Sequence, residues 1–524
     1  LESISIMMHL GIRRRSRIVG WAVLIALLPV LPPSVAQDAA VPGGGGATDV
    51  ESPGVGKLPW SAQQEQLGGL PARRMTHARE FLSLLSIDES QLAGFADGQP
   101  LGVQDEETVV RMLYSIPRFP LNDLQRWAQP IENLAALIAA PGDHRADTFL
   151  IRGRTTKIER VEILPEAVER LEFDHYFRVH VELDASPHVA VLCCREIPAA
   201  WVSSAILDEP TIAYGLFLKL GAGDEERTEF AFATPHIGWL PSKPNVAAGI
   251  TPDLVQLASL GMDVSLFDDV RNLNHKPIAQ ADRECFYQLL ATLGKADAEV
   301  IRSHARPTVD LASLLQEPAT QHGRLMVVRG TARRAMNIRV DDEDIRERFG
   351  IDHYYQIDVF IQLGDQVVRL GKQTDGEGPT FTNSYPTTVC VLQLPPGLPE
   401  GTDIREEVSI PAACFKLWAY RSRFVSAFDK DQLQVSPMFI GVEPQVIKIN
   451  MSQNPYIGFA VAGVFVAVLA FAWIALWRSG KSDSKFQRDV LSRRREVQPG
   501  SSLNDAGIEE QGEPDFSKWD KEDF

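Results

Sequence analysis

The sequence has few cysteines and none of the common catalytic signatures. Its 524 residues include five cysteines, with no C-x-x-C pair and no His/Cys cluster at zinc spacing, which argues against a disulfide framework and a zinc site. The motifs GxSxG, HExxH and GxxxxGK[ST] are also missing, so no nucleophile elbow, zinc protease or P-loop is indicated. We expect no metal and no cofactor, and a non-catalytic protein is favoured over an enzyme.

Positive charge is also scarce. The formal net charge is −17 at pH 7, whereas a nucleic-acid-binding protein needs a basic face to replace phosphate counterions. Nucleic acid is therefore excluded as an expected partner. The cysteines are expected to be buried free thiols, because they lie within apolar strand or helix patterns; they are Cys193, Cys194, Cys285, Cys390 and Cys414.

The two ends of the chain carry the patterns of export and membrane insertion. Residues 1–36 have a basic start, a short apolar core and a small-x-small site ending at Ala36, which predicts a cleaved signal peptide; an uncleaved anchor is the alternative. Residues 37–70 are rich in Gly and Pro, which predicts a flexible linker. An uncharged run over 456–477 precedes a basic stretch, so we expect a transmembrane helix. Residues 478–524 are expected to be a largely disordered cytoplasmic tail.

The middle of the chain repeats itself. "FLIRGRTTKIERV" from Phe149 corresponds to "MVVRGTARRAMNI" from Met326, and a collinear series of matches surrounds this pair. The offset is 177 at Gly153 and Gly330 and grows to about 200 further on. We therefore predict two domain-sized copies, over 71–245 and 246–446.

Each copy changes from helical to strand periodicity at its midpoint. A glycine lies within the first strand of each copy and predicts a bulge or bend there. The strand order resembles the five-stranded OB barrel, and an unrelated small β-barrel or sandwich is the alternative. The expected fold class is α+β, with a helical segment followed by an OB-like barrel in each copy. The first-copy strands are expected at 147–162, 175–184, 188–195, 211–220 and 229–238.

One polar triplet is written twice, as Asp174-His175-Tyr176 and Asp352-His353-Tyr354. Asp beside His suits a binding or proton-transfer site, although adjacent strand residues point to opposite faces. An Asp that begins a strand, with a half-exposed His, is the competing interpretation. Two arginines before the paired glycines are candidates for anion binding, and pairing with a neighbouring Asp or Glu is the competing interpretation. The binding candidates are thus Asp174, His175, Asp352, His353, Arg152 and Arg329, and no catalytic residue is assigned.

These patterns favour a non-catalytic, single-pass plasma (inner) membrane protein with an exported, duplicated ectodomain that binds or scaffolds in a cell envelope. The alternatives are a membrane-tethered hydrolase acting at the Asp-His-Tyr strand edges and a receptor that signals to the tail. The expected partners are the membrane and envelope proteins or glycans, together with a second copy in a homodimer.

Overall fold

The computed structural model describes residues 75–447 and 462–477, except 132–133, 172, 185, 203–206, 224–226 and 371–378. The expected signal peptide, linker and tail lie outside these residues. The structure is α+β and divides into two compact units, one ending at Lys448 and the other beginning at Ile449.

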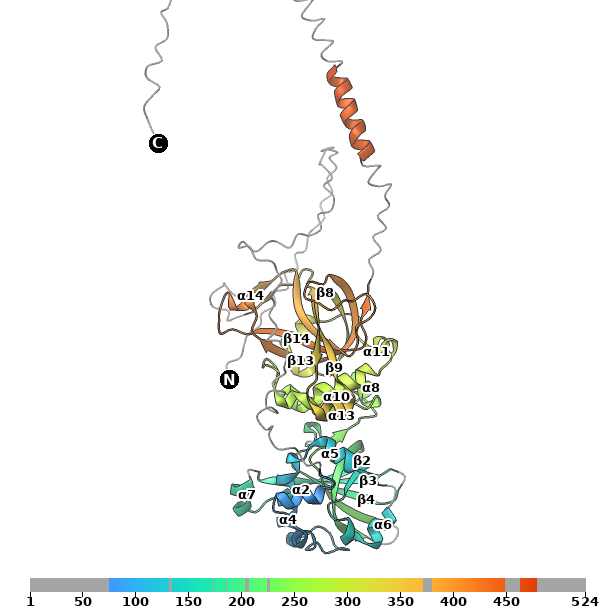
Figure 1. Ribbon diagram of the computed structural model, residues 1–524, viewed down its shortest axis with the longest axis vertical. Coiled ribbons are helices and arrows are strands. Elements are labelled where there is room, and N and C mark those ends of the chain that lie inside the picture. Colours follow the sequence, from blue (N-terminus) through green and yellow to red (C-terminus); the bar gives the residue numbers. More distant parts are fainter. Residues whose placement is uncertain are drawn as a thin grey trace, which may run out of the picture. The chain divides into compact units, whose positions relative to one another are not determined.

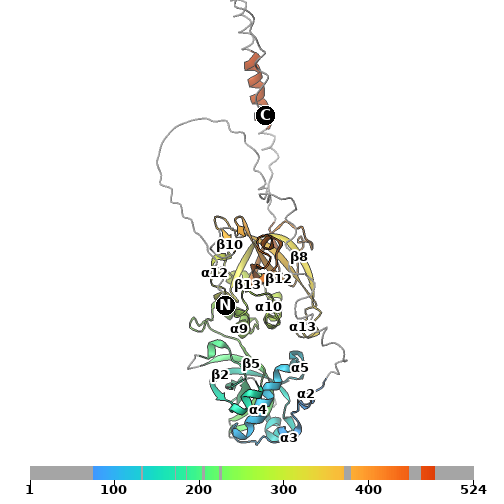
Figure 2. The ribbon, with the colours of Figure 1, turned by 90° about the vertical axis from the view of Figure 1, so that its left-hand side faces the viewer.

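Short helices open the first half of the larger unit. The longest, α4, buries Val109, Met112 and Leu113 on one face, and it packs against two strands of the first sheet (Figure 2). The helices are α2 (Ala78–Leu84), α3 (Glu89–Leu92), α4 (Val103–Ser115), η1 (Ile116–Arg118), α5 (Leu121–Trp127), α6 (Leu134–Ala139), η2 (Pro141–His144), α7 (Pro165–Leu171) and η3 (Ala199–Trp201).

The first sheet has seven strands in the order β1-β2-β3-β4-β6-β5-β7, and β2 also pairs with β5. Only the β1–β2 and β4–β6 pairings are parallel. The strands are β1 (Gln129–Pro130), β2 (Thr148–Glu162), β3 (His175–Leu183), β4 (Val189–Cys194), β5 (Glu209–Gly223), β6 (Thr228–Ala233) and β7 (Ile237–Trp239).

The second half repeats this plan (Figure 1). Its helix α10 packs against β12 and β14, as α4 packs against β4 and β6. The helices are α8 (Pro252–Ser259), η4 (Val264–Leu266), α9 (Phe267–Arg271), η5 (Gln280–Asp282), α10 (Arg283–Gly294), α11 (Ala298–His304), α12 (Leu311–Gln316), η6 (Pro318–Thr320), α13 (Glu343–Phe349) and α14 (Arg423–Ser426).

The second sheet has six strands in the order β14-β12-β9-β8-β13-β15, and β14 also pairs with β13. A separate two-stranded hairpin lies between β9 and β12 in the sequence. The strands are β8 (Leu325–Arg339), β9 (His353–Gln362), β10 (Val368–Arg369), β11 (Thr380–Phe381), β12 (Ser384–Val391), β13 (Glu406–Tyr420), β14 (Gln434–Gly441) and β15 (Gln445–Val446).

The prediction of a small five-stranded OB-like barrel is wrong, because the sheets have seven and six strands. The added strands are two or three residues long, too short to show an alternating pattern in the sequence. The predicted strand 229–238 is in fact two strands, β6 and β7. Pro235, which lies between them, lacks the N–H that a continuous strand would need.

The paired glycines are required by close contact between strands. A Cβ atom on Gly153 would lie 2.1 Å from the carbonyl oxygen of Glu182, and one on Gly330 would lie 2.2 Å from that of Phe360. Neither glycine has a positive φ, so the close strand contact, and not a left-handed backbone, requires glycine at these positions. The register shifts come slightly later in each strand, between Thr155 and Lys157 and at the matching point of β8.

The second unit contains a described helix over 462–477, which covers the later part of the predicted span 456–477. Within the described residues, no helix is both long enough and apolar enough to cross a bilayer. The predicted transmembrane helix and single-pass membrane localisation are therefore contradicted.

One hydrophobic core runs through both halves of the larger unit. It includes Phe149 and Phe217 from the first half together with Leu257, Phe286 and Phe415 from the second. The two halves thus share buried apolar surface, which brings the end of the first sheet against the helices of the second half.

Candidate ligand-binding pocket between the two halves

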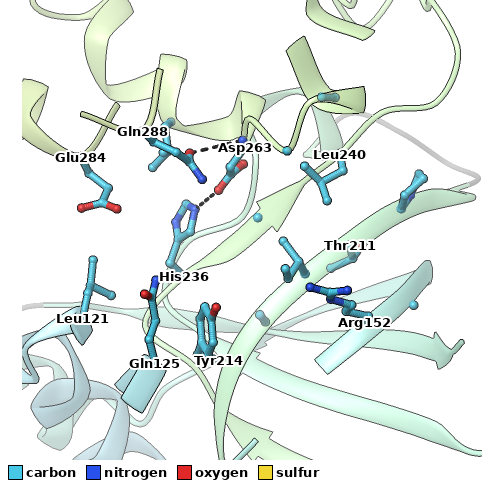
Figure 3. A pocket seen from close by; sticks show the side chains of 18 of the residues that line it. Leu121, Gln125, Arg152, Thr211, Tyr214, His236, Leu240, Asp263, Glu284 and Gln288 are labelled. Carbon is cyan, nitrogen blue, oxygen red and sulfur yellow. Dashed lines mark hydrogen bonds and ion pairs between the residues drawn. The ribbon is translucent and has the colours of Figure 1, made fainter. Parts of the chain in front are cut away.

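A cavity of about 860 Å³ lies where the first sheet meets the helices of the second half (Figure 3). Its first-half wall comes from α5, β2, β5 and the segment around β7, and its second-half wall from α8, η4, α10 and α13. Most of the wall is apolar or neutral, with a few convergent polar side chains. Those labelled in Figure 3 are Gln125, Arg152, Thr211, Tyr214, His236, Asp263, Glu284 and Gln288.

Asp263 joins the two halves from within this wall. It precedes η4, and its Oδ1 accepts hydrogen bonds from the backbone N–H groups of Ser265, at 3.0 Å, and of Trp239, at 2.8 Å. The first bond begins the helical turn, and the second holds the last residue of β7. A single carboxylate therefore caps a helix in one half and binds a strand in the other.

His236 completes this contact. It follows Pro235 in the turn between β6 and β7, and its Nε2 lies 2.6 Å from Oδ2 of Asp263. The His236 side chain is 45% exposed, toward the cavity, while that of Asp263 is 8% exposed. Burial disfavours the charged imidazole, but attraction to Asp263 outweighs it and raises the pKa of His236.

Ser265 stands beside His236 and Asp263, yet the three do not form a nucleophilic triad. The Ser265 hydroxyl is 2.6 Å from Oδ1 of Asp263 and 3.2 Å from Nε2 of His236. That same Nε2 faces the carboxylate, so it is not placed to take the serine proton as a general base. The hydroxyl is buried and donates to Asp263, which makes Ser265 a support for the carboxylate.

Ion pairs fix the charged side chains of the second-half wall. Arg348 donates two hydrogen bonds of 2.6 Å to the carboxylate of Glu284 and two of 2.9 Å to that of Asp344. Asp344 also accepts a 3.1 Å hydrogen bond from the backbone N–H of Asn122, in α5 of the first half. The network holds α10, α13 and α5 together around one end of the pocket.

Two charged residues at the first-half rim lack such partners. Among the described residues, neither the guanidinium of Arg152 nor the carboxylate of Asp184 makes an ion pair or a side-chain hydrogen bond, and both are exposed. Arg154, by contrast, is paired with Asp208. Of the six residues predicted as binding candidates, Arg152 alone lines this pocket; Arg329, its counterpart on β8, is exposed and does not.

The repeated Asp-His pairs lie elsewhere. Nδ1 of His175 is 2.5 Å from Oδ1 of Asp174, and the pair Asp352–His353 is joined at 2.6 Å. The aspartates precede their strands, so the side chains do meet, contrary to the opposite-face expectation. The two pairs belong to different sheets, and a pocket of about 700 Å³ beside His353 is lined by second-half residues without His175.

A duplicated buried ion pair was missed in the sequence. Lys219 of β5 reaches Asp105 of α4 at 3.0 Å, and Lys416 of β13 reaches Asp282 of η5 at 3.0 Å. Each aspartate also accepts a hydrogen bond from the backbone N–H three residues earlier. Burial raises the pKa of Asp282 and lowers that of Lys416, although their mutual attraction opposes both shifts. The sequence does indicate this pair, because the two aspartates align across the repeat, as do the two lysines, and each lysine interrupts an apolar strand.

Cysteine and metal chemistry contribute little to the site. All five cysteines are buried free thiols, as predicted, and burial raises the pKa of Cys193 and of Cys414 to about 12. Among the described residues, no group of three His, Cys, Asp or Glu side chains is placed to hold a metal ion.

Comparisons with known proteins do not show which family the chain belongs to. No protein-family model matches the chain, and no curated protein matches it. Among solved structures, the chain has a distant similarity to an aspartyl tRNA synthetase from Entamoeba histolytica, with 10% identity, a TM-score of 0.14, and coverage of 42% of this chain and 48% of that one. The chain thus spans about half the length of that structure, and so low a score carries no argument.

Proposed function

We propose that this protein is a non-catalytic binding protein, and that the pocket between its two halves holds a small, largely apolar molecule. The observation that carries the proposal is the cavity of about 860 Å³, lined by both halves. Ligand sites are usually concave, mostly apolar and ~300–1,000 Å³ in volume, with a few polar groups that orient the ligand.

Two further features support binding without catalysis. The polar groups of the pocket are held by fixed partners, as with Glu284 on Arg348 and Asp263 on His236, so the wall is largely pre-formed. Ser265, the hydroxyl nearest to His236, donates its proton to a carboxylate and so is not activated as a nucleophile.

Binding of N-phenyl-1-naphthylamine, an uncharged apolar dye that fluoresces when it leaves water, tests the proposal on the full chain. We expect saturable 1:1 binding that Ser259→Trp removes, because Ser259 is exposed and lines the pocket. Gln256→Trp, on the same helix α8 but outside the lining, is the matched control and should bind normally. If the Ser259→Trp variant binds the dye as the original protein does, the proposal is wrong.

The non-catalytic part has its own test. Hydrolysis of p-nitrophenyl butyrate should not exceed the buffer rate. Hydrolysis that Ser265→Ala abolishes would contradict it and would make this pocket a hydrolase site. The expected protein or glycan partners and the homodimer remain predictions.

A further inference from the structure

The two acidic side chains near the centre of the pocket have charged or hydrogen-bonding partners, whereas one basic side chain of the pocket has none within the described part of the chain. Both carboxylates near its centre are occupied, Asp263 by His236 and two backbone N–H groups and Glu284 by Arg348. The guanidinium of Arg152, which lines the other side in Figure 3, has no partner among the described residues. The pocket therefore has an uncommitted cation and no uncommitted carboxylate at its centre.

Two uncharged polar side chains of the pocket are also available as hydrogen-bond donors. Burial raises the pKa of Tyr214, so its hydroxyl keeps its proton at neutral pH. The side-chain oxygen of Gln288 is occupied by the backbone N–H of Asp263, which leaves its amide nitrogen as a donor. A ligand rich in acceptor oxygens would satisfy these groups.

We infer that the ligand is an anion with an apolar body, and that Arg152 binds its acidic group while the body lies against Ile212, Leu240 and Leu266. This inference rests on the proposed function, since it assigns a chemistry to the same pocket. Arginine is suited to the role because its planar guanidinium donates two parallel hydrogen bonds to a carboxylate or sulfonate.

Asp184 is the one charged residue at the rim that opposes an anion. It follows β3, and its backbone N–H donates to the carbonyl oxygen of Arg152 at 3.1 Å, so its position beside Arg152 is fixed. Its carboxylate is exposed and makes no ion pair with Arg152. Removing that charge should therefore strengthen the binding of an anion and weaken the binding of a cation.

The test compares two dyes with the same ring system on the full chain. 1-Anilinonaphthalene-8-sulfonate carries a sulfonate that N-phenyl-1-naphthylamine lacks. We expect the anionic dye to bind about tenfold more tightly, and Arg152→Gln to remove that advantage while leaving the neutral dye unchanged. Asp184→Asn should raise the affinity for the anionic dye alone. Arg329→Gln, the matched exposed arginine of β8, should change neither.

The outcomes separate the two proposals. Equal affinity for both dyes, or equal weakening of both by Arg152→Gln, would overturn the anion assignment while the pocket stands. Anionic-dye binding that survives Ser259→Trp would place that dye outside the pocket and overturn the anion assignment, whereas the proposed function falls only if binding of the neutral dye survives as well. Tighter anionic binding that responds only to Arg152 and Asp184, and weakens as salt rises, supports the inference.

Discussion

The same structural position is built with charges in the first half and without them in the second. Arg145 donates to the carbonyl oxygens of Leu218 and Phe95 and pairs with Asp97. At the matching place His322 contacts the carbonyl oxygen of Phe415, at 2.6 Å, and the Nδ2 of Asn274, at 2.9 Å.

The backbone contact of this position is the same in both halves. Asp97 accepts from the backbone N–H of Leu220, and Asn274 accepts from that of Leu417. The comparison shows that the fold requires a hydrogen-bond acceptor for one strand N–H and a donor for one strand carbonyl at this position. It does not require that the two side chains be charged. The buried Asp–Lys ion pair, in contrast, is retained in both halves. Substitutions in both halves test how far the two are equivalent.

The largest effect is expected from Asp282→Ala, which leaves Lys416 buried and unpaired. Losing one partner of a buried ion pair costs ~3–5 kcal/mol. The free energy of unfolding, measured with urea at pH 7, should fall by that amount, and Asp105→Ala should cost the same in the first half. Asp341→Ala, at an exposed position, is the control and should change it by less than ~0.5 kcal/mol. Unequal costs for the two buried aspartates would break the equivalence of the halves.

The next effect is a pH dependence that the second half should show at this position and the first half should not. Burial lowers the pKa of His322 from 6.5 to about 4, and its two contacts suit a neutral ring that donates through Nδ1 and accepts at Nε2. The unfolded chain binds this proton more readily, so stability falls as the pH drops from about 6.5 to about 4. The loss reaches about 3 kcal/mol, because each pKa unit is worth ~1.4 kcal/mol.

His322→Gln should flatten that part of the stability-against-pH curve, measured by urea unfolding at several pH values. Arg145→Gln, at the matching position of the first half, should lower stability without changing the slope. A slope that survives His322→Gln would assign the titration to another group.

A smaller effect is expected at the strand contact. Gly330→Ala places a Cβ atom against the backbone of Phe360, which should lower the free energy of unfolding by ~2 kcal/mol, and Gly153→Ala should do the same. Gly142, with open space around its Cβ position and no positive φ, is the control. A shift of the melting temperature in the control as large as in Gly330→Ala would show that the strand contact is not the cause.

The smallest effect is expected from His236→Met, which removes the imidazole that pairs with Asp263. Pairing with Asp263 raises the pKa of His236 above 6.5. The resulting stabilisation is present below that pH and is lost as the pH rises through the folded-state pKa, opposite in direction to His322. The half-exposed side chain keeps the effect small. Titration by NMR gives the His236 pKa directly, and a value below 6.5 would refute the pairing.

Much of the architecture could be predicted from the repeat. The alignment of Gly153 with Gly330 gave the two equivalent first strands, and β2 and β8 do lie at an offset of 177. Strand β7 could not be predicted, because three residues carry no usable periodicity. The closeness of the neighbouring strands at each glycine was equally invisible, since it depends on the geometry of a partner far away in the sequence.

The candidate site was hidden for another reason. Asp88-x-Ser90 and Asp263-x-Ser265 are the same helix cap in the two copies, and in each the serine hydroxyl bonds to the aspartate. In the first half this cap faces solvent, and in the second it holds His236. Sequence comparison reveals the cap, but only the packing of one half on the other reveals which copy acquired a partner. Arg152 was found, because its unusual place before a strand glycine was readable locally.

The bond from Trp239 to Asp263 closes a loop of only 24 residues. Each doubling of such a loop adds only ~0.6 kcal/mol of closure cost, and a tether this short holds its two ends at millimolar effective concentration. The contact between the halves can therefore be individually weak and still remain formed. A single proteolytic cut between β7 and α8 would remove that advantage and turn the contact into an ordinary bimolecular one, whose occupancy depends on protein concentration.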